Sequence, residues 1–167
     1  MNIKIIGGVA DIKDTAEFIK TLGDVARKYN VTVQALDANK IASVEHLRFA
    51  VEKAMRSMSS QTNISKDLGM EILLYASGRR QISKALQLGV SPGKSNVAIV
   101  IVGDGAERAA KEIKNLIQEA PVLEYNESKR DAILKTFGIT DAEMEAVGED
   151  KIPKLVLERV ALVDILK

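Results

Sequence analysis

The sequence predicts an α/β fold, in which a small mixed β-sheet packs against several α-helices within a single domain over residues 1–167. Three observations predict it. Some short stretches alternate apolar with polar residues or consist of consecutive apolar residues, which is typical of strands. Longer stretches repeat apolar residues at helical spacing. Apolar residues also make up 46% of the 167 residues, which is the length and composition of one globular domain.

The beginning of the chain alternates predicted strands and helices. Residues 2–6 are expected to form a strand that ends at the adjacent glycines Gly7 and Gly8, and residues 11–29 an amphipathic helix. Residues 31–36 alternate apolar and polar side chains, which predicts a second strand and completes a βαβ-like opening.

The middle of the chain is predicted to be mostly helical. Ser43 is the expected N-cap of a helix that reaches Met58. A second helix should begin at Ser65 and end at Gly78. Residues 70–76 are an apolar run that periodicity alone does not separate from a buried strand, but Gly78 stands where a glycine would end a helix and favours that interpretation. Residues 79–88 should form a third, shorter helix.

A buried strand and further helices complete the prediction. Residues 97–102 are six consecutive apolar residues and predict the buried strand. A helix over 106–117 and a short strand over 122–125 are expected to follow it. Thr140 with Glu143 then fits a capping box that starts a small helix.

The predicted C-terminal helix, which begins near Pro153, is apolar on too many sides for one core-facing stripe. Two interpretations remain open at this point: the helix is buried on two sides within its own domain, or part of its surface contacts another molecule. The apolar positions concerned are Leu155, Val156, Leu157, Val160, Ala161, Leu162 and Val163.

Composition argues against most catalytic classes. The absence of cysteine excludes disulfides, thiol nucleophiles and thiolate-bound metals. The single histidine, His46, precludes a multi-histidine metal site and is expected to be a surface or packing residue. We therefore expect no metal and no cofactor, and the composition leans away from an enzyme without deciding the matter. Because no stretch has the length of a signal peptide core or a membrane span, we also expect a soluble, cytoplasmic protein without membrane contact.

Two glycine motifs suggest nucleotide binding but depart from the required patterns. Gly93-Lys94-Ser95 lacks the first glycine of a phosphate-binding P-loop and precedes a strand instead of a helix. Gly103-Asp104-Gly105 does follow the buried strand and open a helix, but Arg108 stands where a third glycine is needed, and Asp104 is expected to cap the helix. A small nucleotide-binding enzyme using this turn remains an alternative.

The near-neutral net charge of +1 conceals two segments of opposite sign. No acidic residue occurs between Glu71 and Asp104, whereas residues 104–150 contain 12 acidic and 6 basic residues. The acid-free segment includes Ser77-Gly78-Arg79-Arg80-Gln81, and guanidinium groups beside a helix start suit phosphate binding. A solvated surface without a ligand is the other interpretation of these two arginines.

Residues 43–94 carry a distinctive pattern. It consists of the string EILLYASGRRQI at residues 71–82, Ala85 and Gly89-Val90 after it, and His46-Leu47, Ala50 and Ala54 before it. This pattern resembles the small tRNA-binding subunit of the KEOPS complex, the family of the PRPK-binding protein (TPRKB). Leu88 departs from the family pattern, which often has an aromatic residue there, and residues 104–150 match no family motif.

The resemblance implies a non-catalytic subunit of the machine that makes threonylcarbamoyladenosine in tRNA. Such a subunit binds the single-stranded 3′ CCA end of tRNA and docks on an atypical kinase/ATPase subunit of the complex. A kinase-binding regulator without RNA contact is the alternative within this class. The expected RNA-binding residues, of which Tyr75 would stack on a base, are Lys66, Tyr75, Ser77, Gly78, Arg79, Arg80, Gln81 and Lys84, and the expected partner-binding residues are Leu155, Val156, Arg159 and Val160.

Overall fold

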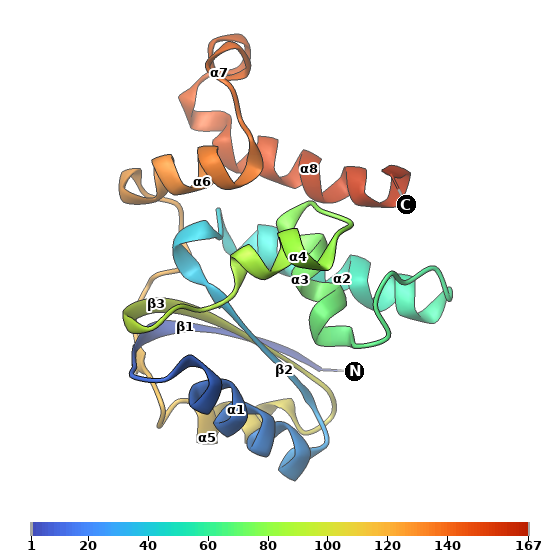
Figure 1. Cartoon of the computed structure of the whole chain (residues 1–167), viewed down its shortest axis with the longest axis vertical. Coiled ribbons are helices and arrows are strands. Elements are labelled where there is room, and N and C mark those ends of the chain that lie inside the picture. The colour runs from blue at the N-terminus through green and yellow to red at the C-terminus, as the bar shows by residue number, and fades with distance from the viewer. Residues whose placement is uncertain (1, 167) are drawn as a thin grey trace. The chain divides into compact units, whose positions relative to one another are not determined.

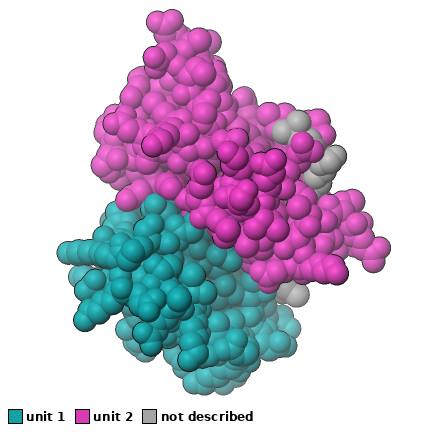
Figure 2. Space-filling model, in the orientation of Figure 1, with its two compact units in different colours: residues 1–38, 89–122 teal, residues 39–88, 123–167 magenta. Residues whose placement is uncertain are grey.

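The computed structural model describes residues 2–166, which form two compact units (Figures 1 and 2). Unit 1 contains the residues up to 38 together with residues 89–122, and unit 2 contains residues 39–88 and those from 123 onwards. The predicted α/β class, a small sheet packed with several helices, is confirmed. A single domain over residues 1–167 stays a prediction.

Unit 1 is a four-stranded sheet with two helices on one of its faces (Figure 1). The strand order is β2-β3-β1-β4, and every pairing is antiparallel instead of mixed. Since β3 lies between β1 and β2, the βαβ-like opening is split by a strand from later in the chain. The elements are β1 (Ile3–Ile12), α1 (Thr15–Tyr29), β2 (Thr32–Asp37), β3 (Gly93–Val102), α5 (Ala106–Ile113) and β4 (Gln118–Glu119).

The first strand continues through the two glycines that were expected to end it. Gly7 and Gly8 pair with Ala98 and Val97 of β3, and Gly8 also pairs with Glu119 of β4. A Cβ at Gly8 would lie 2.5 Å from the main-chain oxygen of Gln118, so the glycine lets β4 approach. This pairing joins residues that are far apart in the chain. The strand expected over residues 122–125 is absent from that range, and β4 lies just before it.

Unit 2 is helical. Its helices are α2 (Val44–Ser59), α3 (Leu68–Ser77), α4 (Ile82–Ala85), α6 (Arg130–Phe137), α7 (Asp141–Val147) and α8 (Ile152–Leu166). Short 3₁₀ turns, η1 (Ala38–Lys40), η2 (Leu86–Leu88), η3 (Glu127–Lys129) and η4 (Glu149–Lys151), accompany the helices.

Local capping signals place several of these helices. Ser43 caps α2 by accepting a hydrogen bond from His46 N at 3.0 Å, and Thr140 forms the expected capping box with Glu143 at the start of α7. The cap of α3 differs from the prediction, because Asp67 accepts from Met70 N and Ser65 lies in the preceding turn.

Helix α3 occupies the centre of unit 2. Gly69 and every residue from Glu71 to Ser77 are buried and Met70 is half-buried, so this part of the helix has no fully exposed side. It contacts α2, α4 and α8. The position of α3 therefore decides which residues at its C-terminal end reach the surface.

Candidate functional site

The expected RNA-binding segment begins at the end of α3, where glycine reverses the chain. Gly78 has a φ of +68°, and its N–H donates to Tyr75 O at 3.0 Å. Arg79 N donates to Leu74 O at 3.2 Å and to the Ser77 hydroxyl at 3.1 Å. These bonds form a Schellman-type end with the predicted glycine, and they direct the following residues outward.

We define residues 79–84 as the basic segment. Arg79, Arg80, Gln81 and Lys84 are all exposed. Of the helix predicted over residues 79–88, only residues 82–85 are α-helical. The helix begins three residues later than predicted and continues as the 3₁₀ turn η2. Arg79 and Arg80 therefore lie in the loop before α4, and Lys84 lies in the one turn that this helix forms.

Lys66 is exposed but is not brought to the basic segment. It precedes α3, whereas Arg79 follows it, and ten helical residues lie between them. A helix of that length separates its ends by about 15 Å. Lys66 is therefore a separate candidate contact for an extended ligand.

Tyr75 contradicts the expectation of a stacking platform. Its side chain is fully buried, and its hydroxyl donates a hydrogen bond to Asp164 of α8. Burial, followed by the bond to Asp164, raises the pKa of the phenol, which keeps it protonated. Because α3 is covered on all sides where Tyr75 lies, the tyrosine ring packs in the core. Ser77 is also buried, and its hydroxyl donates to Leu74 O at 2.8 Å.

Two apolar side chains next to the basic segment are exposed instead. Ile82 is 45% exposed and Leu86 is 55% exposed. They are four residues apart and so share one side of the α4–η2 turn, while Ala85 and Leu88 are buried. The surface that accompanies the cations is therefore aliphatic rather than aromatic.

Arg79 and Arg159 both bind the C-terminal end of α6. Arg79 Nη2 donates to Thr136 O at 3.2 Å, while Arg159 Nε donates to Phe137 O at 3.0 Å. Arg159 Nη2 also contacts Gly138 O at 3.3 Å and Glu143 Oε1 at 2.8 Å. Arginine at the negative end of a helix dipole satisfies carbonyls that the helix leaves unpaired. Arg159 thus fixes α6 and α7 to α8, which differs from the expected partner contact.

The other three expected partner-binding residues are in the core. Leu155, Val156 and Val160 are buried on the inner side of α8, so they cannot meet a partner in this state. Helix α8 nevertheless has more apolar residues than its inner side holds, and the additional ones lie on another side of the helix. Sequence alone does not show which apolar row faces inward. Among the α8 residues whose side chains the structure describes, the apolar ones beyond Pro153 that reach the surface are Leu157, Ala161, Leu162 and Ile165.

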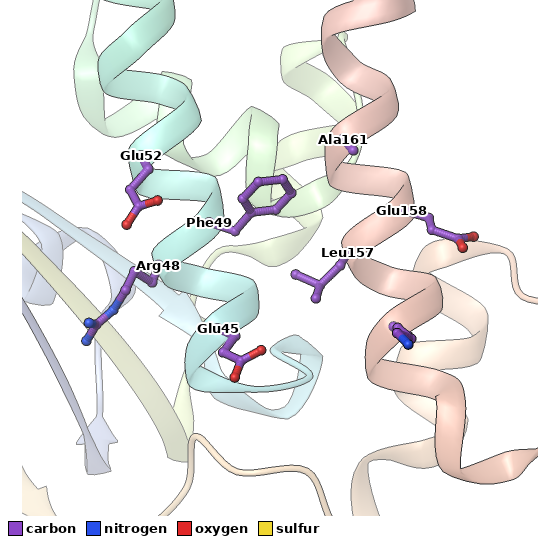
Figure 3. A pocket seen from close by; sticks show the side chains of 8 residues that line it. Glu45, Arg48, Phe49, Glu52, Leu157, Glu158 and Ala161 are labelled. Atoms are coloured by element: carbon purple, nitrogen blue, oxygen red, sulfur yellow. The ribbon is translucent and has the colours of Figure 1, made fainter.

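A groove lies between α2 and α8 (Figure 3). It has a volume of about 530 Å³, and Figure 3 shows Phe49 of α2 and Leu157 and Ala161 of α8 on its inner sides. We call this the α2–α8 groove. Sequence analysis did not identify Phe49, whose only signal is an aromatic residue beside the predicted core stripe of α2. The remaining lining residues are Glu45, Arg48, Glu52, Lys154 and Glu158.

His46 is a structural residue. It is fully buried, its Nδ1 accepts from Ala42 N at 3.0 Å, and its Nε2 donates to Ala76 O at 2.8 Å. Burial lowers the pKa of the imidazole to about 4. Both ring nitrogens are therefore engaged by the main chain of unit 2, and the ring packs edge-on against Phe137.

The glycine motifs have structural explanations. Gly93-Lys94-Ser95 forms the start of β3. A Cβ at Gly103 would lie 2.9 Å from a Val31 methyl group, and one at Gly105 would lie 2.6 Å from Tyr29 O. Gly105 itself is the N-cap of α5, and no side chain caps that helix, so Asp104 does not have the expected role. These glycines allow close packing within unit 1.

No group of three His, Cys, Asp or Glu side chains within residues 2–166 is placed to hold a metal ion.

None of the helices in the described part of the chain combines the length and apolar character needed to cross a membrane.

Comparison with known proteins identifies the family. A family model described as "Kinase binding protein CGI-121" matches residues 9–164. The regulatory protein Cgi121 of Methanocaldococcus jannaschii is 30% identical over 134 residues, which cover 80% of this chain and 84% of that protein. These matches confirm the family resemblance seen in residues 43–94. The chain therefore belongs to the kinase-binding protein CGI-121 family.

Proposed function

We propose that the chain is a non-catalytic, cytoplasmic subunit of the KEOPS complex that binds the 3′ CCA end of tRNA and docks on the atypical kinase/ATPase subunit. It would thereby recruit tRNA for threonylcarbamoyladenosine synthesis and support the activity of its partners. The description of the family as kinase-binding supports the docking half of the proposal. The description of its relative as a regulatory protein supports a role without catalysis.

The observation that carries the RNA half is the joint exposure of Arg79, Arg80 and Lys84 in a segment that lacks acidic residues. Guanidinium and ammonium groups pair with phosphates, and such contacts dominate affinity for nucleic acids. Gln81 is exposed between them and offers an amide that both donates and accepts hydrogen bonds. The segment therefore supplies contacts for a sugar–phosphate backbone.

Base contacts would come from aliphatic side chains and arginine planes, since Tyr75 is buried. Ile82 and Leu86 are exposed beside the cations and offer apolar surface to unstacked bases. A single-stranded end suits such a surface better than a duplex, whose bases are stacked and paired. This supports a single-stranded terminus as the ligand.

Binding of tRNA with and without its CCA end tests the RNA half. The wild-type chain is expected to bind intact tRNA at least about tenfold more tightly than the truncated form. Arg80→Glu with Lys84→Glu should weaken binding about 10- to 100-fold at low salt, because both phosphate contacts are replaced by repulsion. Lys13→Glu with Lys20→Glu, which makes the same charge change at exposed positions of unit 1, is the matched control.

The outcomes separate the two functions that the resemblance implies. Equal binding of both tRNA forms would contradict recognition of the 3′ end. Loss of kinase binding together with loss of RNA binding in the Arg80/Lys84 variant would point to misfolding or a shared surface. No tRNA binding by wild-type protein that does bind the kinase would favour the purely allosteric regulator.

A further inference from the structure

We infer that a pocket in unit 1 binds a phosphate group, supplied either by the sugar–phosphate backbone of an RNA or by a free phosphate monoester. The pocket has a volume of about 410 Å³ and is lined by Tyr29 of α1, by Arg108, Lys111 and Glu112 of α5, and by Asn115 in the turn after α5. We call it the α1–α5 pocket. None of these residues belongs to the basic segment, so the pocket is a site in addition to the proposed one.

The pocket forms where α1 and α5 pack side by side (Figure 1). Gly105 lets the end of α1 approach α5, because a Cβ there would lie 2.6 Å from Tyr29 O. Arg108 and Lys111 are three residues apart and both exposed, so they share the outer side of α5. The residues of the inner side, which are buried, are Ala106, Ala109, Ala110 and Ile113.

Tyr29 orders one of the two cations. The guanidinium carbon of Arg108 lies 5.4 Å from the centre of the Tyr29 ring, which is a cation–π contact. The ring is itself fixed, since its hydroxyl donates to Glu112 Oε1 at 3.1 Å. A guanidinium held in one place loses less conformational entropy on binding, and its N–H groups can donate two parallel hydrogen bonds to phosphate oxygens. The contact with Tyr29 therefore prepares Arg108 for an anion.

The charges of the pocket are unbalanced in favour of the cations. Glu112 is already paired, because it accepts from Lys28 Nζ at 2.7 Å, and this bond lowers the pKa of the Glu112 carboxyl. Glu107 of α5 lies 3.9 Å from a lysine of β1. Within residues 2–166, by contrast, neither Arg108 nor Lys111 forms an ion pair. Two adjacent cations without acidic partners attract an anionic ligand.

The donor set favours phosphate over a carboxylate or a base. A phosphate monoester carries nearly two negative charges at neutral pH, which match Arg108 and Lys111, and the amide of Asn115 adds a further donor. Lys28 Nζ also lies 5.2 Å from the centre of the Tyr29 ring. Because two cations already contact this ring, a base would have to displace one of them in order to stack on it. The group recognised in the pocket is therefore the phosphate.

Nuclear magnetic resonance of the isotope-labelled full chain, titrated with inorganic phosphate at constant ionic strength, tests the site. Saturable shifts are expected for the side-chain N–H groups of Arg108 and Asn115. Arg108→Gln with Lys111→Gln should weaken phosphate binding, followed at Asn115, at least about tenfold because both cations are removed. Lys13→Gln with Lys20→Gln changes the net charge equally at exposed positions of unit 1 and should leave phosphate binding unchanged.

Two variants of Tyr29 separate the ordering of Arg108 from the charge of the pocket. Tyr29→Leu removes the ring but no cation, and it should weaken phosphate binding about two- to fivefold through loss of the cation–π contact. Tyr29→Phe keeps the ring and should bind phosphate as wild type does. Wild-type affinity in Tyr29→Leu would contradict the ordering of Arg108 by the ring.

Binding of tRNA identifies the source of the phosphate. If an RNA backbone supplies it, Arg108→Gln with Lys111→Gln should weaken binding of intact and CCA-truncated tRNA by the same factor, about three- to tenfold. The slope of log affinity against log salt should also fall by about one to two. Phosphate shifts without any change in tRNA affinity would support the pocket and assign it to a free phosphate monoester.

The outcomes distinguish this inference from the proposed function. If phosphate causes no shifts at Arg108 and Asn115, or chloride at the same ionic strength causes equal ones, the inference fails while the proposed function stands. If the wild-type chain binds phosphate in this pocket but binds no tRNA, the RNA half of the proposed function fails while the inference stands. An equal loss of phosphate binding in the Lys13/Lys20 variant would also overturn the inference, since net charge alone would explain it.

Discussion

The guanidinium of Arg159 spans from the main-chain oxygen of Phe137, at 3.0 Å, to the carboxylate of Glu143, at 2.8 Å. It thereby connects the end of α6 and the start of α7 to the middle of α8. The hydrogen bond from Arg159 is also the first cause that lowers the pKa of the Glu143 carboxyl. The helical end of unit 2 is thus organised around one arginine.

Arg159→Met should destabilise the protein by about 1–3 kcal/mol, because it leaves helix-end carbonyls and a carboxylate without their donor. Urea unfolding measures the change. Arg80→Met is the control, since no hydrogen bond or ion pair of Arg80 is found within residues 2–166, and it should stay within about 0.5 kcal/mol of wild type. Equal stability of the two variants would contradict the structural role of Arg159.

Tyr75→Phe separates a core role from base stacking. Removing the hydroxyl that binds Asp164 should cost about 1–2 kcal/mol of stability, measured by thermal unfolding. Affinity for tRNA should stay within about twofold, since the buried ring does not reach a ligand. Ile82→Ser is the complementary change, because an exposed apolar residue should affect tRNA binding more than stability. A large loss of tRNA affinity in Tyr75→Phe would contradict the buried position.

Burial of His46 makes stability dependent on pH. Its folded pKa of about 4 lies below its ordinary value of 6.5, so the unfolded chain binds the proton more readily. The stabilisation is complete above pH 6.5 and is lost as the pH falls towards 4, with a total of roughly 3 kcal/mol. Glu112, Glu143 and Glu149, whose pKa values are lowered, lose their contributions only below their ordinary value of 4.5.

Urea unfolding at several pH values between 7 and 5 measures the contribution of His46. Wild-type stability should fall across this interval. His46→Gln should be less stable at pH 7 but show a flatter pH dependence, because the titrating group is absent. An equally steep decline in the variant would assign the pH dependence to another residue.

The elements that sequence analysis predicted correctly depend on neighbours in the chain. The cap at Ser43, the left-handed glycine at Gly78 and the capping box of Thr140 involve residues no more than five positions apart. Each of them therefore left a readable pattern in the sequence.

The elements that it missed depend on partners far along the chain. The continuation of β1 through Gly8 requires pairing with β3 and β4, and the inward phase of α8 depends on which helices surround it. Tyr75 shows the same limit, since an apolar run without periodicity does not reveal that all its sides are covered. For the candidate site, the charge pattern predicted the exposed cations, but burial of the aromatic ring and the position of the groove required the fold.

Two glycines in unit 1 should respond oppositely to replacement by alanine. At Gly8 a Cβ would lie 2.5 Å from Gln118 O, so Gly8→Ala should displace β4 and cost about 1–3 kcal/mol. At Gly23, within α1, the nearest atom is a flexible Arg27 nitrogen at 3.5 Å. Gly23→Ala should therefore stabilise the protein by about 0.5–1 kcal/mol through helix propensity. Thermal unfolding of both variants checks the two signs, and the same sign for both would contradict the packing at Gly8.

Arg79 and Arg80 are adjacent in sequence but should have separable effects. Arg79→Gln removes the bond to Thr136 O and a candidate phosphate contact, so it should lower both stability and tRNA affinity. Arg80→Gln should lower tRNA affinity about as much, and reduce the slope of log affinity against log salt by about one, with stability unchanged. Filter binding over a salt series, paired with urea unfolding, measures both properties. If Arg80→Gln changes neither the affinity nor the salt slope, phosphate binding by the basic segment is wrong, and the exposed arginine only solvates this surface.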